Sequence, residues 1–117
     1  MEKWDEKMLL LHLVPIEMGT SQWIIRKNTN DRSLFIVGSG EVTIFGRTTT
    51  TIKDGGIFGC HEFVTGNKWE VDVICNKAGT LLKLDYDTFT DLVDTSSKAA
   101  ANIWRRVVKR LCWDMID

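Results

Sequence analysis

The segment Asp54–Phe63 contains the residues of this chain that are best suited to chemistry. It reads Asp-Gly-Gly-Ile-Phe-Gly-Cys-His-Glu-Phe, and the strand-like segment Trp69–Cys75 follows it. A glycine-bracketed turn that leads into a short helix between two strands leaves backbone N–H groups unpaired and directed outward. Such groups bind a small anion, of which phosphate is typical. The segment therefore predicts a phosphate-binding cradle.

The same segment also contains residue types that bind metal ions. Cys60, His61 and Glu62 are consecutive, and consecutive residues of a helix project about 100° apart. His12 stands alone near a strand entry, and no CxxC pair lies elsewhere to complete four ligands. We expect no metal site and no metal cofactor, and His61 is expected at the surface or half-buried on the short helix that follows the glycine turn.

No arrangement of side chains predicts an enzyme. Neither histidine has the order of serine or cysteine partners that a hydrolase triad requires. Asp85 and Asp87 precede a helical pattern, where carboxylates favour the positive end of the helix dipole. They are better explained as helix-start residues than as a catalytic pair.

Composition indicates a single module without general affinity for polyanions. The chain has 117 residues, of which 44% are hydrophobic, which suits one domain with its own core. A net charge of −1 and a pI near 6.1 give no overall attraction to nucleic acid or anionic lipid. No apolar run approaches the roughly 20 residues of a membrane helix, and the first residues lack a secretory signal. We expect a cytoplasmic module, or the cytosolic part of a membrane protein.

The cysteines predict free thiols. Cys60, Cys75 and Cys112 are odd in number, lie far apart and form no CxxC pair. This spacing argues against a disulfide framework or a zinc finger, so reduced thiols are expected.

Periodicity divides the chain 1–117 into a helix over 3–12, a β-roll over 13–85 and C-terminal helices over 86–114. Short runs of period two, bounded by Asn, Asp, Gly or Ser, recur every 8–12 residues and predict about seven or eight strands. The runs are 22–26, 33–37, 41–45, the threonine run near 48–51, 70–75 and 79–85. Evenly spaced short strands favour an antiparallel β jelly roll, a mainly β fold with flanking helices.

The last predicted helix is amphipathic and basic. It begins near the capping residues 94–97 and continues to about Trp113. Trp104, Val108 and Cys112 share one apolar ridge, while the other tryptophan of the helix lies on a different face. Four of its cations are Arg105, Arg106, Lys109 and Arg110. They form either a solvated face or a contact surface for an acidic partner or a membrane.

Three segments in order resemble the cyclic-nucleotide-binding domain family. Residues 22–42 are similar to its entry strand, turn and "aromatic, isoleucine, x, x, glycine, acidic, valine" segment. Residues 52–59 are similar to its approach to the phosphate-binding cassette, and residues 81–89 to its closing strand and helix start. The resemblance implies a jelly roll with a short internal helix and two C-terminal helices, and a regulatory role that is not catalytic.

The resemblance also implies a ligand site with two departures from the family pattern. The family usually has a glutamate after the Phe-Gly pair for the ribose hydroxyl, and Cys60 stands there. It has an arginine for the cyclic phosphate where this chain has Trp69, with Lys68 just before it. Glu62 is a hypothetical substitute for the ribose contact. The candidate ligand-binding residues are Gly56, Phe58, Gly59, Cys60, His61, Glu62, Lys68 and Trp69, and the candidate lid residues are Trp104, Val108 and Cys112.

Two functions follow from this resemblance. The first is a regulatory module of a larger signalling or ion-transport protein, which senses cAMP or cGMP through residues 54–73 and relays the signal through its last helix to the host or a partner protein. The second is a degenerate module that binds no nucleotide and serves in protein interaction or tethering. Under the second, the ring of Trp69 fills the pocket; the alternative for this residue is an exposed strand aromatic. We expect no nucleic acid partner and no direct membrane span.

Overall fold

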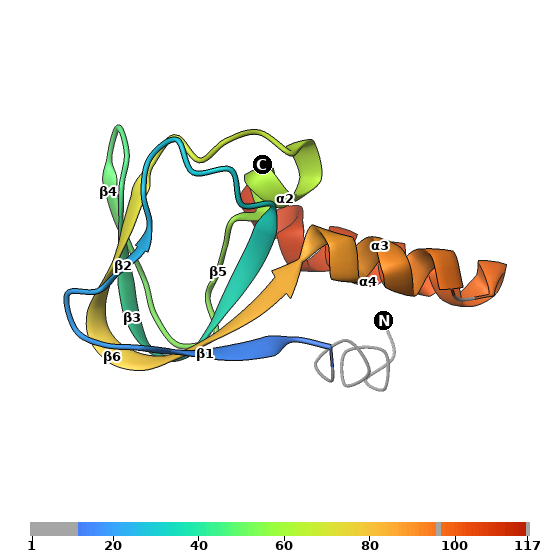
Figure 1. The fold of residues 1–117 in the computed structure, drawn as a ribbon, viewed down its shortest axis with the longest axis horizontal. Coiled ribbons are helices and arrows are strands. Elements are labelled where there is room, and N and C mark those ends of the chain that lie inside the picture. The colour runs from blue at the N-terminus through green and yellow to red at the C-terminus, as the bar shows by residue number, and fades with distance from the viewer. Residues whose placement is uncertain (1–11, 96, 117) are drawn as a thin grey trace.

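The protein is described by a computed structural model, which covers residues 12–95 and 97–116. The expected helix over 3–12 lies outside the described residues except for His12. Within them, six strands form one antiparallel sheet that curls into a roll (Figure 1). The strands are β1 (Val14–Met18), β2 (Trp23–Ile25), β3 (Ser33–Phe45), β4 (Thr49–Ile52), β5 (Ile57–Phe58) and β6 (Asp72–Asp85). The helices are α2 (Cys60–Thr65), α3 (Tyr86–Thr95) and α4 (Lys98–Ile116).

The predicted number of seven or eight strands is wrong for the described residues, because two pairs of expected strands are continuous. β3 runs through both 33–37 and 41–45, and β6 runs through both 72–75 and 79–85. The two strands pair along their length with register shifts between Val37 and Val42, where bulges bend them together. A side chain at Gly79 would overlap the Ser39 carbonyl, so glycine is required where β6 passes this bulge of β3.

The other strands complete the jelly roll by pairing with the two halves of these long strands. The first half of β3 pairs with β5, and its second half pairs with β4. In the same way, β2 pairs with the start of β6 and β1 with its end. The antiparallel jelly roll predicted from the sequence is thereby confirmed.

Alternate side chains of the long strands point into two separate cores. Leu34 and Leu84 face each other across β3 and β6 and point toward the helices. Their neighbour Phe35 points into the roll, as the period of two requires. The helix-side core comprises Leu13, Leu34, Cys60, Phe63, Leu84, Phe89, Val93, Ala101, Val108 and Cys112. The roll core comprises Met18, Ile25, Phe35, Val37, Val42, Phe58, Trp69, Val73, Cys75 and Leu81.

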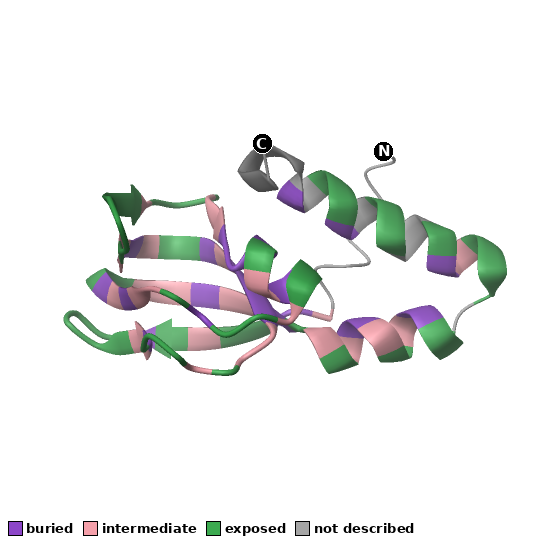
Figure 2. Ribbon diagram, turned by 90° about the horizontal axis from the view of Figure 1, so that it is seen from above, coloured by how far each residue is buried: buried purple, intermediate pink, exposed green. Residues whose placement is uncertain are grey.

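The two C-terminal helices form a hairpin beside the roll. Asp85, the last residue of β6, caps α3 by accepting from the Asp87 N–H at 3.1 Å, and Ser97 Oγ caps α4 by accepting from the Ala100 N–H at 3.2 Å. These contacts agree with the helix-start role expected for Asp85 and Asp87. α4 then runs back along α3 toward the roll (Figures 1 and 2), so its last turns lie beside α2.

Candidate functional site

The predicted cassette folds as a tight turn from β5 into the six-residue helix α2. Gly59 caps the start of the helix with φ 88°, and Gly66 ends it with φ 76°. A Cβ at Gly59 would lie 2.7 Å from the Ser33 carbonyl oxygen and 2.8 Å from Cη2 of Trp69. Only glycine therefore allows both the left-handed backbone and the close approach of the indole.

The glycine turn before β5 supplies fewer free N–H groups than the sequence suggests. The Gly55 N–H donates to the Val37 carbonyl at 2.7 Å, and the Gly56 N–H donates to the Lys53 carbonyl at 2.9 Å. These two amides are thus part of the fold and not of an anion cradle, so the unpaired N–H groups predicted for this segment are not those of Gly55 and Gly56. The first-turn amides of α2 have no intrahelical acceptor, but the carboxylate of Glu62 lies in that same turn.

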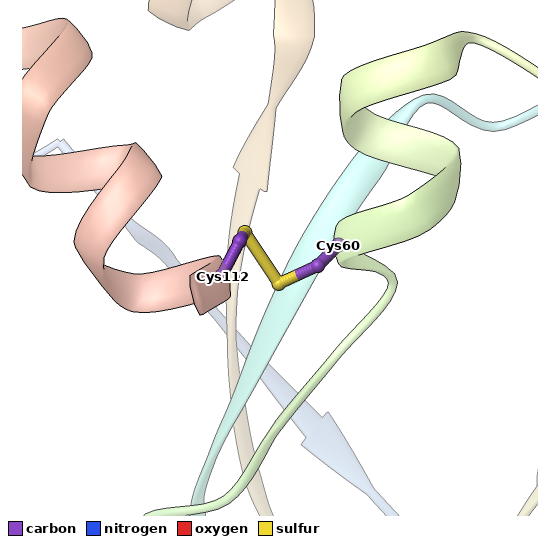
Figure 3. Close-up of a disulfide and its surroundings, with 2 residues drawn as sticks. All are labelled: Cys60 and Cys112. Atoms are coloured by element: carbon purple, nitrogen blue, oxygen red, sulfur yellow. A yellow bond between two sulfur atoms is a disulfide. The ribbon is translucent and has the colours of Figure 1, made fainter. Parts of the chain in front are cut away.

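Cys60, the first residue of α2, forms a disulfide with Cys112 of α4. The two sulfur atoms meet between the helices in Figure 3, and the two Cα atoms are 5.5 Å apart. Both residues are buried. The expectation of reduced thiols is wrong for this pair, because a separation of 52 residues in sequence conceals that α4 returns to the cassette.

Trp69 is buried inside the roll, with a relative exposure of 1%. Its indole Nε1 donates to the Asp31 carbonyl oxygen at 2.7 Å, and its ring packs against those of Phe35 and Phe58 with centroids 6.1 and 6.2 Å away. The reading of Trp69 as an exposed aromatic is therefore wrong. β6 begins only at Asp72, so the predicted strand over 69–75 is three residues too long at its start.

The other candidate residues separate into exposed and buried groups. His61 and Lys68 are exposed and Glu62 is half-buried, whereas Phe58 and Gly59 are buried. The structure brings together Gly59, Phe58 and Trp69. It directs Cys60 away from them, toward α4.

Sequence reasoning missed Arg32, which joins the cassette helix to the hairpin. Its guanidinium donates to the carbonyl oxygens of Phe63 and Val64 at 2.8 and 3.0 Å, at the end of α2. It also lies 3.3 Å from the ring centroid of Tyr86, the first residue of α3, whose N–H donates to the Arg32 carbonyl. An arginine in a polar loop carries no motif that would have indicated this role.

Asp31 organises the same loop on the roll side. Its carboxylate accepts from Ser33 Oγ at 2.7 Å and pairs with Lys83 Nζ at 3.0 Å, while its carbonyl holds the Trp69 indole. Both charged groups of this pair are partly exposed, so its contribution to stability is small. Its effect is to fix the loop that positions Trp69.

The lid candidates lie on the helix-side core. Val108 and Cys112 are buried against α2, whereas the side chain of Trp104 lies outside the described residues. A pocket of about 380 Å³ that is open to solvent lies between the three helices. Its apolar lining consists of Phe63 and Val64 of α2, Tyr86 and Phe89 of α3, and Val108 and Cys112 of α4.

Comparison with protein-family models decides the family. The model described as "Cyclic nucleotide-binding domain" matches residues 16–96, which include the roll from Ile16 onward and the whole of α3. The chain belongs to this family. No curated protein matches it.

Solved structures with the same fold include several that come from regulatory proteins. The Thermus thermophilus catabolite activator protein gives a TM-score of 0.72 at 15% identity, covering 98% of this chain and 57% of that one. The c-di-GMP-responsive global regulator CLP of Xanthomonas campestris gives 0.73 at 18% identity, covering 97% and 57%. The regulatory domain of Toxoplasma gondii PKA, solved with cAMP, gives 0.67 at 21% identity, covering 87% and 40%. This chain therefore spans about half the length of these proteins, and the likeness concerns the fold.

As a cyclic-nucleotide-binding domain, the chain carries a regulatory rather than a catalytic type of module. Where the resemblance expects a glutamate, the Cys60 sulfur is bonded to another sulfur and has no O–H or carboxylate to offer a sugar. Where the resemblance expects an arginine, the structure has the buried indole of Trp69. Within the described residues, no helix is long and apolar enough to cross a membrane.

Proposed function

We propose that this chain is a regulatory module of a larger signalling or ion-transport protein, in which Trp69 occupies the place of the cyclic nucleotide. The observation that carries the proposal is the burial of the indole against Gly59, with its only N–H donated to Asp31. Displacing it would expose a large apolar ring and an unpaired carbonyl. A nucleotide would have to offset that cost without the arginine and glutamate contacts that the family pattern supplies.

The module acts on its host or on a partner protein through α4. This helix contacts both the cassette helix and α3, so a change at either reaches it directly. Its cations Arg105, Arg106, Lys109 and Arg110 are exposed, as is Lys98 at its start, and the four suit an acidic partner surface. The module then responds to partner binding or to its own covalent state and not to cAMP or cGMP.

Calorimetric titration with cAMP and with cGMP tests this function. We expect no saturable binding to the native chain at ligand concentrations up to about 1 mM, the weak end of specific affinity. The variant Trp69→Arg restores the phosphate partner and is expected to gain about tenfold to a hundredfold in affinity. Trp23→Arg is the matched control, because Trp23 is 44% exposed on β2. Micromolar binding by the native chain would overturn the proposal.

The second candidate function is cyclic nucleotide sensing. It is supported by family membership and by Gly59, which still directs the first-turn amides of α2 outward from a left-handed cap. Under this candidate, the native chain binds nucleotide and Trp69→Phe binds it equally well or better. The same titrations therefore separate the two candidates.

A further inference from the structure

The Cys60–Cys112 disulfide is placed where a covalent change would alter the whole site. It joins the first residue of the cassette helix α2 to the second-last turn of α4 (Figure 3). Both residues belong to the helix-side core, with relative exposures of 2% and 0%. The loop that it closes contains β6, α3 and most of α4.

We infer that Cys60 and Cys112 form a reversible redox modification site, whose oxidation holds α4 against the cassette and whose reduction releases it. The inference rests on the proposed function in that α4 is the element that acts on the host. It adds the signal to which the module responds, because thiol oxidation controls α4 here as nucleotide binding does in the family pattern.

The packing between α2 and α4 explains why one bond can decide the position of the helix. The buried side chains at this contact are apolar, with Val108, Cys112 and Phe63 in one core cluster, while Arg105 and Lys109 line the neighbouring pocket. The pocket of about 380 Å³ lies directly beside them. Atoms that line this open pocket face solvent on one side, so the packing of α4 against α2 covers only part of the apolar surface there. The disulfide supplies the constraint that the packing does not.

The reduced form remains compatible with the fold. A free cysteine behaves as a small apolar side chain, so both thiols can stay in the helix-side core. Reduction therefore removes the tether between α2 and α4 without placing a charge or an unpaired polar group in the core. The roll has a separate core of its own and is not affected.

The third cysteine does not compete for either partner. Cys75 lies in the roll core on β6, and its Sγ donates to the Lys77 carbonyl at 3.2 Å. Burial raises the pKa of the Cys75 thiol. Since the thiolate is the reactive form, Cys75 stays a thiol while the other two exchange.

The reaction is a thiol–disulfide exchange with a small disulfide such as glutathione disulfide. One protein thiolate attacks a glutathione sulfur and releases the first glutathione thiolate, which leaves a mixed disulfide. The second protein thiolate attacks the protein sulfur of that mixed disulfide and releases the second. Two protein thiols are oxidised, one glutathione disulfide is reduced to two glutathione molecules, and the two thiol protons pass to the released thiolates. Because both sulfur atoms are buried, either direction proceeds only when α4 lifts.

Hydrogen–deuterium exchange of the native chain tests the inference without nucleotide. The chain is equilibrated either with dithiothreitol or with glutathione disulfide, and mass spectrometry of alkylated peptides assigns the state of each cysteine. In the reduced sample, we expect the exchange of α4 amides to rise by about tenfold or more, as local opening becomes easier. The amides of β3 and β6 are expected to exchange at unchanged rates. Returning the sample to glutathione disulfide should restore the protection of α4.

Two variants give the test its controls. Cys112→Ala should show fast α4 exchange in both conditions, since it cannot form the bond. Cys75→Ser keeps a donor for the Lys77 carbonyl and should respond to the redox state as the native chain does. Equal α4 exchange in both conditions, an exchange change of the same size in β3, or a mixed disulfide as the end product would each overturn the inference.

The hydrogen–deuterium exchange experiment and the nucleotide titrations test two separate proposals. If α4 responds to oxidation while the native chain binds cAMP tightly, the redox site stands and the self-occupied pocket fails. If α4 does not respond and no nucleotide binds, the redox site fails and the self-occupied pocket stands.

Discussion

At the scale of single residues, Gly59 decides whether Trp69 can occupy the roll. We expect Gly59→Ala to destabilise the fold by about 3 kcal/mol, the sum of the left-handed backbone cost and of overpacking. Gly55→Ala is the matched control, because Gly55 has φ 83° but no atom lies within 4 Å of the methyl that alanine would add, and about 1 kcal/mol is expected. Urea denaturation measures both. Equal losses would mean that the contacts of Gly59 with Ser33 and Trp69 contribute nothing.

The sequence predicts where the residues of this turn lie in the chain better than it predicts which residues they contact. The Phe-Gly pair marked the turn into α2, because turn glycines and aromatic residues carry local signals, but the sequence left open whether the ring of Trp69 is buried or exposed. The partners Asp31 and Cys112 lie 38 and 52 residues from Trp69 and Cys60. No local signal predicts such contacts, since they depend on how β3 and α4 return to the cassette.

At the scale of elements, Arg32 connects the end of α2 to the start of α3. We expect Arg32→Ala to cost about 2 kcal/mol, because two carbonyl oxygens lose a charged donor and Tyr86 loses its stacked guanidinium. Arg32→Lys should recover only part of this loss, since an ammonium lacks the planar fork. Arg26→Ala is the control: Arg26 also covers a ring, that of Trp23, but at an exposed site. Exchange in α2 should rise only in the Arg32 variants, and a similar rise in Arg26→Ala would contradict this role.

The elements themselves were largely predictable, and the exceptions have one physical cause. The helix start at Asp85 and the threonine strand were placed correctly from capping and β-propensity. β3 and β6 were each read as two strands, because Gly38, Gly40 and Gly79 look like turns in the sequence. In the roll they lie at bulges between the paired strands β3 and β6, and the backbone pairing of the two strands continues through them.

At the scale of the whole molecule, two cores are built on opposite faces of the same pair of long strands. Only the helix-side core contains the disulfide, so redox state changes the coupling of the hairpin to the roll and leaves the interior of the roll intact. Under the proposed function, the fold keeps the family architecture while Cys60 and Trp69 stand in place of the two ligand contacts that the resemblance implies.

The thermal stability of the chain should therefore depend on the redox state of one cysteine pair. A disulfide that closes a loop of this length typically contributes about 2–4 kcal/mol, and this one acts on the helix-side core, so we expect dithiothreitol to lower the temperature at which the C-terminal hairpin unfolds by about 10 °C or more and to leave the unfolding of the roll unchanged. The variant Cys60→Ala should unfold near the temperature of the reduced native chain and show no response to dithiothreitol. Cys75→Ser should keep the full response, because Cys75 lies in the other core. Scanning calorimetry measures all three proteins, and an unfolding temperature of the native chain that is the same with and without reductant would show that the bond does not join the hairpin to the roll.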